Sequence, residues 1–154
     1  MNKSDTNQEQ LLEKNSVAET ANLALPPYVE QIGEAYMNER QRAHFRCLLL
    51  QWKQRLLAHM NRTVHHLHEA AAFPDALDRA TQEEVFHVEL RTRDREHNLI
   101  KKIEEALQKL DKKEYGYCDV CDAQIGIRRL EARPTAMLCI DCKTLAELRE
   151  RARG

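Results

Sequence analysis

The feature that most constrains this chain is a set of four cysteines near the C-terminal end, arranged as two C-x-x-C pairs. The pairs are Cys118–Cys121 and Cys139–Cys142, and seventeen residues separate them. Each pair places two sulfurs on one tight turn, and two such turns at this separation are typical of a four-thiolate zinc site. Four thiolates complete a tetrahedron and leave no open position for water or substrate. The spacing therefore predicts one structural Zn²⁺ in a small module covering residues 112–154.

The composition favours long solvated helices over a thick globular core. Of the 154 residues, 32% are charged and only 5% are aromatic, and the length allows one domain or two small modules. The formal net charge of −1 argues against a protein that coats DNA as a polycation. No apolar run approaches the roughly 20 residues of a membrane span, and the N-terminal residues lack the apolar core of a signal peptide. We therefore expect a cytoplasmic protein with no membrane segment, in which reduced thiols bind metal or act as redox centres.

Apolar or packable side chains recur at steps of three or four residues in two series, which is the pattern of a coiled-coil seam. The first series comprises Phe45, Leu49, Trp52, Leu56, Met60, Val64, Leu67 and Ala71, and the second comprises Val85, Val88, Thr92, Arg95, Leu99, Ile103, Leu107 and Leu110. The first helix can be capped by Asn38. Two helices of about 35 residues would each be on the order of 50 Å long.

The connector between the two series is short and contains Pro74, which stops the first helix. Such a connector makes the helices antiparallel neighbours, so residues 36–111 are predicted to form a hairpin, here called the finger. Pairing centred on residue 75 predicts contacts where two residue numbers add up to about 150, for example between Trp52 and Leu99.

The remaining segments complete a mainly α fold: a long antiparallel two-helix coiled-coil finger on a small base, with the four-cysteine zinc module and a C-terminal helix. Residues 1–35 are polar and are predicted to form a loosely held N-terminal arm. Residues 124–138 are expected to form short strands or irregular connectors around the metal. Residues 140–153 are predicted to be the C-terminal helix, with Leu145 and Leu148 on one face.

Acidic residues concentrate at the end of the finger, here called the tip (residues 73–80). Residues 69–84 carry five acids and one base. Asp75 and Asp78 can cap the second helix and interact favourably with its dipole. They can also bind Mg²⁺ or compete for a site that binds it, and both interpretations stay open. The sequence near them offers neither a nucleophile nor a paired base, so we predict no enzymatic activity.

Basic residues concentrate where the finger meets the zinc module. Lys102 lies near the base of the finger, and Arg133 and Lys143 lie in the module. If the module docks on that base, these three side chains can converge on one anion such as a phosphorylated nucleotide. The alternative is that they offset neighbouring acids. The first predicted helix also carries four histidines, which we interpret as part of a solvated face because nothing nearby in sequence completes a metal site with them. They are His59, His65, His66 and His68.

Several longer motifs resemble the DksA/TraR zinc-finger family of RNA polymerase-binding transcription factors. The resemblance covers about residues 34–150 and includes the tip pattern D-x-x-D-x-A, which is formed by Asp75, Asp78 and Ala80. The other motifs are EAYMN at 34–38, AHF at 43–45, RDRE at 93–96, LIKKIE at 99–104 and the highly specific run GIRRLEARPT at 126–135.

The resemblance implies a specific function. Members of this family bind bacterial RNA polymerase, insert the finger into its secondary channel and, together with ppGpp, modulate transcription initiation without reading promoter sequence. They repress ribosomal RNA promoters and activate some amino-acid promoters. By matching position, Asp75, Asp78 and Ala80 are the functional tip, and Arg91 and Arg95 support polymerase contact. The ppGpp site would use Lys102, Arg133 and Lys143. We expect a monomer that binds no specific DNA sequence.

Four alternatives remain at this stage. The cysteines could hold iron instead of zinc. They could act as a thiol redox sensor rather than as a structural site. A transcript-cleavage factor uses a similar finger whose tip carboxylates hold a catalytic metal, although on a zinc-free base. A direct DNA-binding module would bind promoters without polymerase, with an affinity that falls steeply with salt.

Overall fold

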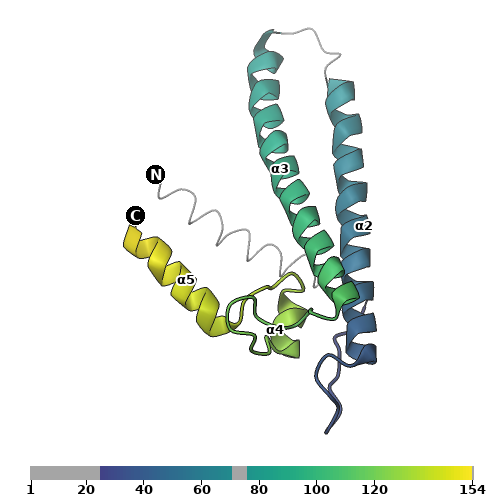
Figure 1. Cartoon of the computed structure of the whole chain (residues 1–154). Coiled ribbons are helices and arrows are strands. Elements are labelled where there is room, and N and C mark those ends of the chain that lie inside the picture. Colours follow the sequence, from purple (N-terminus) through teal and green to yellow (C-terminus); the bar gives the residue numbers. More distant parts are fainter. Residues whose placement is uncertain (1–24, 71–75, 154) are drawn as a thin grey trace.

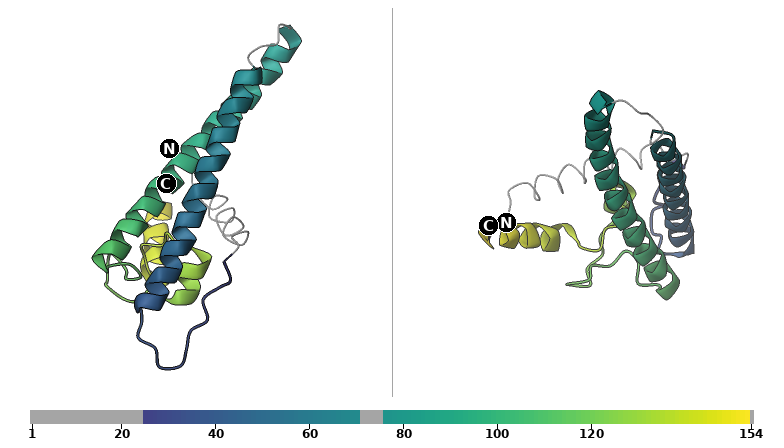
Figure 2. Two further views of the ribbon diagram at one scale, coloured as in Figure 1. Left: turned by 90° about the vertical axis from the view of Figure 1, so that its right-hand side faces the viewer. Right: turned by 90° about the horizontal axis from the view of Figure 1, so that it is seen from above.

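The computed structural model describes the backbone of residues 25–70 and 76–153, and the side chains of residues 25–62 and 83–153. The described part contains four helices, which are α2 (Glu39–Ala70), α3 (Ala76–Lys112), α4 (Ile127–Ala132) and α5 (Ile140–Arg153). The antiparallel helices α2 and α3 form the predicted finger, which rises from a small base that contains α4, and α5 projects from that base (Figures 1 and 2). The expected fold class is therefore confirmed. None of the described helices combines the length and apolar character needed to cross a membrane.

The start of α2 is fixed by side-chain hydrogen bonds. The side-chain oxygen of Asn38 accepts a hydrogen bond from the backbone N–H of Gln41 at 3.0 Å, which is the predicted N-cap. Gln41 is only 1% exposed, and its side chain accepts a bond from the N–H of Met37 at 2.6 Å and donates to Glu34 at 3.0 Å. Because Glu34 also accepts a bond from the Tyr28 hydroxyl at 2.9 Å, the segment before α2 is held against the start of the finger.

The apolar core lies at the base of the finger. Phe45 and Leu49 of α2, Ile103 of α3 and Leu130 of α4 are all fully buried. Residues 124–138 were expected to be strands or connectors, and this was wrong for the part that forms α4. The helix exists because Ile127 and Leu130, three residues apart, both face the core, so one helical turn buries two apolar side chains at once.

The second predicted seam is confirmed near the base and wrong towards the tip. Ile103 and Leu110 are buried, but Val85 and Val88 are 51% and 56% exposed. Polar residues take their place along the inward side of α3, where Glu89 and Glu96 each have a buried carboxylate oxygen. In Figure 1 the two helices diverge towards the connector, so apolar side chains in that region have no opposite helix to pack against. The first seam holds from Phe45 to Met60; its members beyond residue 62 lie outside the described side chains.

Ion pairs across the finger reveal the register. The three cross-finger pairs are Arg46–Asp111, Lys53–Glu104 and His59–Glu96. Their residue numbers add up to 157, 157 and 155, so the predicted value of about 150 was low by about six residues. The reason is that side chains lean towards the N-terminus of their own helix. Because α2 and α3 run in opposite directions, the Cα atom of an α3 residue must lie nearer the base than the Cα atom of the α2 residue that its side chain contacts.

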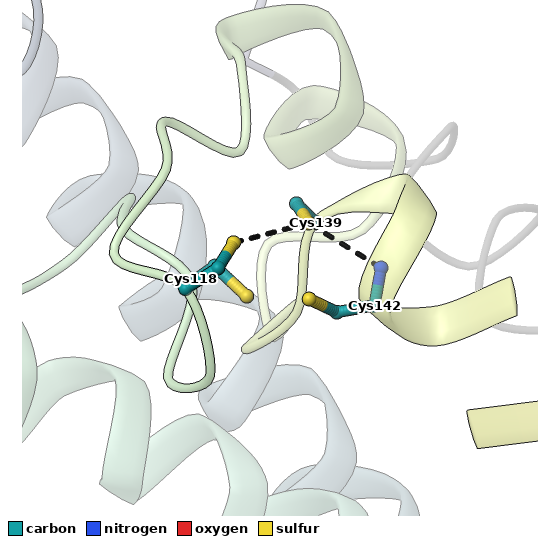
Figure 3. A group of neighbouring side chains, drawn as sticks. Cys118, Cys139 and Cys142 are labelled. Carbon is teal, nitrogen blue, oxygen red and sulfur yellow. Dashed lines mark hydrogen bonds between the residues drawn. The ribbon is translucent and has the colours of Figure 1, made fainter. Parts of the chain in front are cut away.

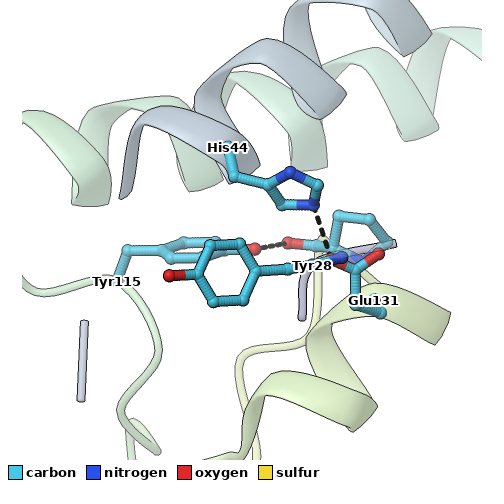
Figure 4. Close-up of polar contacts among 5 residues, drawn as sticks. Tyr28, His44, Tyr115 and Glu131 are labelled. Atoms are coloured by element: carbon cyan, nitrogen blue, oxygen red, sulfur yellow. Dashed lines mark hydrogen bonds and ion pairs between the residues drawn. The ribbon is translucent and has the colours of Figure 1, made fainter. Parts of the chain in front are cut away.

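Three segments far apart in sequence meet beside α2 (Figure 4). A carboxylate oxygen of Glu131 lies 2.5 Å from Nε2 of His44 and accepts a hydrogen bond from the backbone N–H of Tyr28 at 2.9 Å. The buried hydroxyl of Tyr115 donates to the carbonyl oxygen of Pro134 at 2.7 Å. These contacts join the segment before α2, the end of α3 and α4 into one base.

A second junction uses Tyr36. Its hydroxyl donates to the carbonyl of Gly116 at 2.7 Å and accepts a bond from the N–H of Gly126 at 3.0 Å. Gly116 has a φ of +94°, and a Cβ there would lie 2.8 Å from Cγ of Met37. Any other residue at this position would therefore be strained and would collide with the segment that precedes α2.

The helix α5 behaves differently from the rest. It spans the residues predicted for the C-terminal helix, but none of its residues is buried, and Leu145 and Leu148 are each more than half exposed. Within the described part of the chain, nothing packs closely against its apolar side.

Candidate metal centre and basic pocket

The four cysteines converge as the spacing predicted. Their sulfur atoms all lie within 4.8 Å of one another, and the distance between the Cys121 and Cys139 sulfurs is 3.7 Å. Figure 3 shows side chains from the two pairs gathering at one point between the loop and the start of α5. Zinc–sulfur bonds of about 2.3 Å in a tetrahedron require sulfurs about 3.8 Å apart, so the cluster fits one ion of this kind with only small adjustment.

Tight turns position the sulfurs. The N–H of Asp122 donates to the carbonyl of Cys118 at 2.9 Å, and Asp122 adopts a left-handed φ of +56° that closes the first turn. The N–H of Cys142 lies 3.5 Å from the Cys139 sulfur in the second turn, where α5 begins. The N–H of Asp119 donates to the carbonyl of Met137 at 3.0 Å and connects the two turns directly.

The electrostatics of the cluster call for a cation. Burial raises the pKa of the Cys118 thiol, but hydrogen bonds from nearby backbone groups outweigh it and lower the pKa to about 6. By contrast, contacts with the sulfurs of Cys139 and Cys121 raise the pKa of Cys142 to about 12. Four sulfurs this close cannot all be thiolates unless a bound cation offsets their charge. With all four positions taken by protein sulfur, the ion would act as a cross-link and not as a catalyst.

A basic pocket lies between α4 and α5, with a volume of about 610 Å³. It is lined by Arg128, Arg129, Ala132, Arg133, Ile140, Lys143, Thr144 and Glu147. Arg133 and Lys143 were predicted to share an anion, and the structure brings them to this one pocket. Lys102 is exposed on α3 and is not part of the described lining. Lys143 also lies 3.7 Å from Glu147, so one acid partly offsets the positive charge.

Two arginines of the pocket were not assigned a role from the sequence. Arg128 and Arg129 belong to α4 and line the same pocket as Arg133, which directly follows that helix. The run of basic residues was visible in the sequence, but the sequence did not show that this segment and the start of α5 enclose one pocket.

The predicted finger residues are placed less completely. Asp75 lies outside the described residues, and Asp78 and Ala80 belong to the first turns of α3, where side chains are not described. Arg91 and Arg95 are exposed on α3, and Arg95 donates a hydrogen bond to the Thr92 hydroxyl at 3.0 Å. Both arginines are therefore presented on the side of the finger, as a surface contact would require.

A two-helix finger on a base that holds a closed four-cysteine centre defines a class of zinc-binding coiled-coil proteins. Two family profiles match this chain. The first is described as "DnaK suppressor protein DksA, N-terminal domain" and covers residues 41–110. The second is described as "Prokaryotic dksA/traR C4-type zinc finger" and covers residues 113–148. The chain belongs to this DksA/TraR zinc-finger family.

Individual relatives agree with this assignment. The chain is 57% identical over 138 residues to the "RNA polymerase-binding transcription factor DksA" of Escherichia coli K12, covering 89% of this chain and 91% of the relative. It is 59% identical over 126 residues to the protein of the same name from Haemophilus influenzae, covering 81% and 87%. The solved structure of "transcription factor DksA2 from Pseudomonas aeruginosa" matches with a TM-score of 0.72 at 38% identity, covering 88% of this chain and 98% of that one.

Proposed function

We propose that this chain binds bacterial RNA polymerase and, with ppGpp, regulates transcription initiation through it. The observation that carries the proposal is the 57% identity, over nearly the whole length of both chains, to a relative named for RNA polymerase binding. The closed cysteine centre supports a structural metal and a regulator that is not an enzyme. The protein acts in the cytoplasm as a monomer, and it reads no promoter sequence itself.

The finger is proposed to enter the secondary channel of the polymerase. Its helix α3 has 37 residues and is therefore about 55 Å long, which is enough to carry a tip far from the base. Asp75, Asp78 and Ala80 are proposed to act at the tip, near the mobile elements and Mg²⁺ of the polymerase. Arg91 and Arg95 are proposed to contact the channel wall, because both are exposed along the side of α3.

The base is proposed to share ppGpp with the polymerase. Arg133 and Lys143 line the basic pocket, and Lys102 is exposed on the part of α3 nearest the base. Guanidinium and ammonium groups in this number are well suited to phosphate groups. In this assignment residues 1–35 form the arm, residues 36–111 form the finger, and residues 112–154 form the zinc module with the C-terminal helix.

The test of the tip is multi-round transcription from a ribosomal RNA promoter with purified bacterial RNA polymerase. We expect the native protein to repress this promoter and ppGpp to enhance the repression. Asp78→Asn should abolish the repression with polymerase affinity changed by less than about twofold, because the tip is remote from the docking base. Glu105→Gln, which removes an exposed carboxylate nearer the base, is the matched control and should repress normally. A loss of binding as large as the loss of repression would contradict the assignment.

The test of the pocket uses the same assay with Arg133→Ala and Lys143→Ala. Each variant should repress as the native protein does without ppGpp, but should lose the enhancement that ppGpp gives. Lys112→Ala removes an exposed base at the end of α3 and should leave that enhancement intact. If ppGpp enhances repression equally in all three variants, the pocket is not its site.

A further inference from the structure

The finger changes character half-way along its length. From the base to Leu56 on α2 and Ile100 on α3, the facing side chains are buried and apolar. Just beyond that point, Met60 and Leu99 are partly buried against the core, whereas the described apolar residues farther up α3 are exposed: Val85, Phe86, Val88 and Leu90. Hydrophobic packing therefore fixes the lower part of the finger, while the upper part of α3 needs another contact to hold it in place.

The pair His59–Glu96 lies at this boundary. Nδ1 of His59 is 2.6 Å from a carboxylate oxygen of Glu96, and the Glu96 side chain is 12% exposed while that of His59 is 52% exposed. The second carboxylate oxygen of Glu96 is buried and has no hydrogen-bond partner among the described residues. The carboxylate has thus given up most of its contact with water, and His59 compensates one of its two oxygens.

The other two cross-finger pairs are of a different kind. The carboxylates of Asp111 and Glu104 are 65% and 47% exposed, and both pairs lie beside the apolar core. Exposed pairs contribute little to stability, and their geometry follows from the packing around them. A contact to a nearly buried carboxylate between two helices is different, because moving the helices apart leaves the Glu96 carboxylate without its His59 partner. Polar contacts of this kind can specify how the helices of a coiled coil pair.

We propose that His59 and Glu96 are positioning residues that hold the two helices together just above the apolar core and thereby set the lateral position of the tip. This inference rests on the proposed function for its biological consequence, but not for its structural part. The helix α3 is continuous from Ala76 to Lys112, so a displacement at Glu96 is carried to Asp78, eighteen residues away. Eighteen residues of helix span about 27 Å, so a change of about 10° in the direction of α3 at Glu96 would move Asp78 by about 5 Å, which is more than a contact with Mg²⁺ or a mobile loop can absorb.

A charge swap tests the pairing. His59→Glu places two carboxylates opposite each other, Glu96→Lys removes the acceptor, and the double variant restores one acid and one base. We expect each single variant to lose most of its repression of the ribosomal RNA promoter, with polymerase affinity unchanged within about twofold, and the double variant to regain repression. The matched control swaps the exposed pair by Arg46→Glu and Asp111→Arg, which should repress normally both singly and together.

A structural measurement keeps the test independent of the polymerase. Spin labels on the exposed residues Arg62 and Glu83, introduced through a ketone-bearing amino acid so that the cysteines stay with the metal, report the distance across the upper finger. Each single variant should broaden or shift the distance distribution, and the double variant should restore it. The milder His59→Gln and Glu96→Gln serve if a charged variant loses helicity.

The outcomes separate the two proposals. Unchanged distances in the single variants overturn the positioning role, whatever transcription shows. A broadened distribution that the double variant does not restore also overturns it, since the effect would then be unrelated to the pair. If the native protein itself fails to repress, the proposed function falls, while restored distances in the double variant still establish the positioning contact.

Discussion

The substitution Tyr115→Phe tests whether the zinc module and the base of the finger unfold as one unit. Tyr115 is buried, its hydroxyl donates to the buried carbonyl of Pro134 at 2.7 Å, and burial keeps its pKa well above 10, so the donor stays protonated. Phenylalanine fills the same space but leaves that carbonyl without this donor. Leaving a buried acceptor unpaired costs about 1–3 kcal/mol, and we expect a loss of about 2 kcal/mol.

The assay is urea unfolding of the metal-saturated protein, followed by far-ultraviolet circular dichroism for the helices and by a chromogenic chelator for metal release. With a slope of about 2 kcal/mol per molar urea, both midpoints should fall by about 1 M. Tyr28→Phe is the control, because Glu34 keeps the hydrogen bonds from Gln31, Asn38 and Gln41 when the Tyr28 hydroxyl is removed. That loss should be about 0.5–1 kcal/mol. If metal release shifts while the helical transition does not, or if neither midpoint falls by more than it does in Tyr28→Phe, the argument for one unit fails.

Three further predictions follow from the same structure. Asn38→Ala removes the cap of α2 and the hydrogen bond that the Asn38 amide donates to Glu34 at 3.1 Å, and should lower the free energy of unfolding by about 1–2 kcal/mol in urea titration; Asn38→Ser keeps a capping oxygen and should cost less. Burial alone would raise the pKa of Glu34, but the hydrogen bonds that the carboxylate accepts lower its pKa below 4.5. The stabilising effect of the Glu34 carboxylate should therefore be complete at neutral pH and disappear as the pH falls through the lowered pKa. The melting temperatures of Glu34→Gln and of the native protein should differ at pH 7 and converge in acid. Cys118→Ser should reduce metal content and unfold the module around α4, and a melting curve identical to that of the native protein would contradict the coupling of metal binding to folding.

Much of the architecture could be predicted because it depends on local patterns. Steps of three and four residues identify α2 and α3, and Asn38 marks the start of α2. The C-x-x-C pairs predict the metal centre because each pair is itself a turn, and only one relation between the two turns satisfies a tetrahedron.

The features that were missed depend on relations that periodicity does not encode. Val85 and Val88 continue the apolar pattern of α3, yet they are exposed because the opposite helix has diverged at that height. The contact between His44 and Glu131 joins residues 87 positions apart, and neither side chain differs in type from many surface residues. His59 was interpreted as part of a solvated face, and only the register of the two helices reveals that Glu96 is its partner.

The long sequence separations within the base have a consequence for how the chain folds. The contacts of Tyr28 with Glu131, Tyr36 with Gly126 and His44 with Glu131 span 103, 90 and 87 residues. The hairpin of α2 and α3 needs no residue from these distant segments, so it can form before they join it and bring them together, which lowers the entropy cost of closing so long a loop. During synthesis the finger should therefore fold while the ribosome is still making the zinc module. Until that module emerges, Phe45, Leu49 and Ile103 lack their last covering, and the unfinished chain presents an apolar surface that a chaperone can bind.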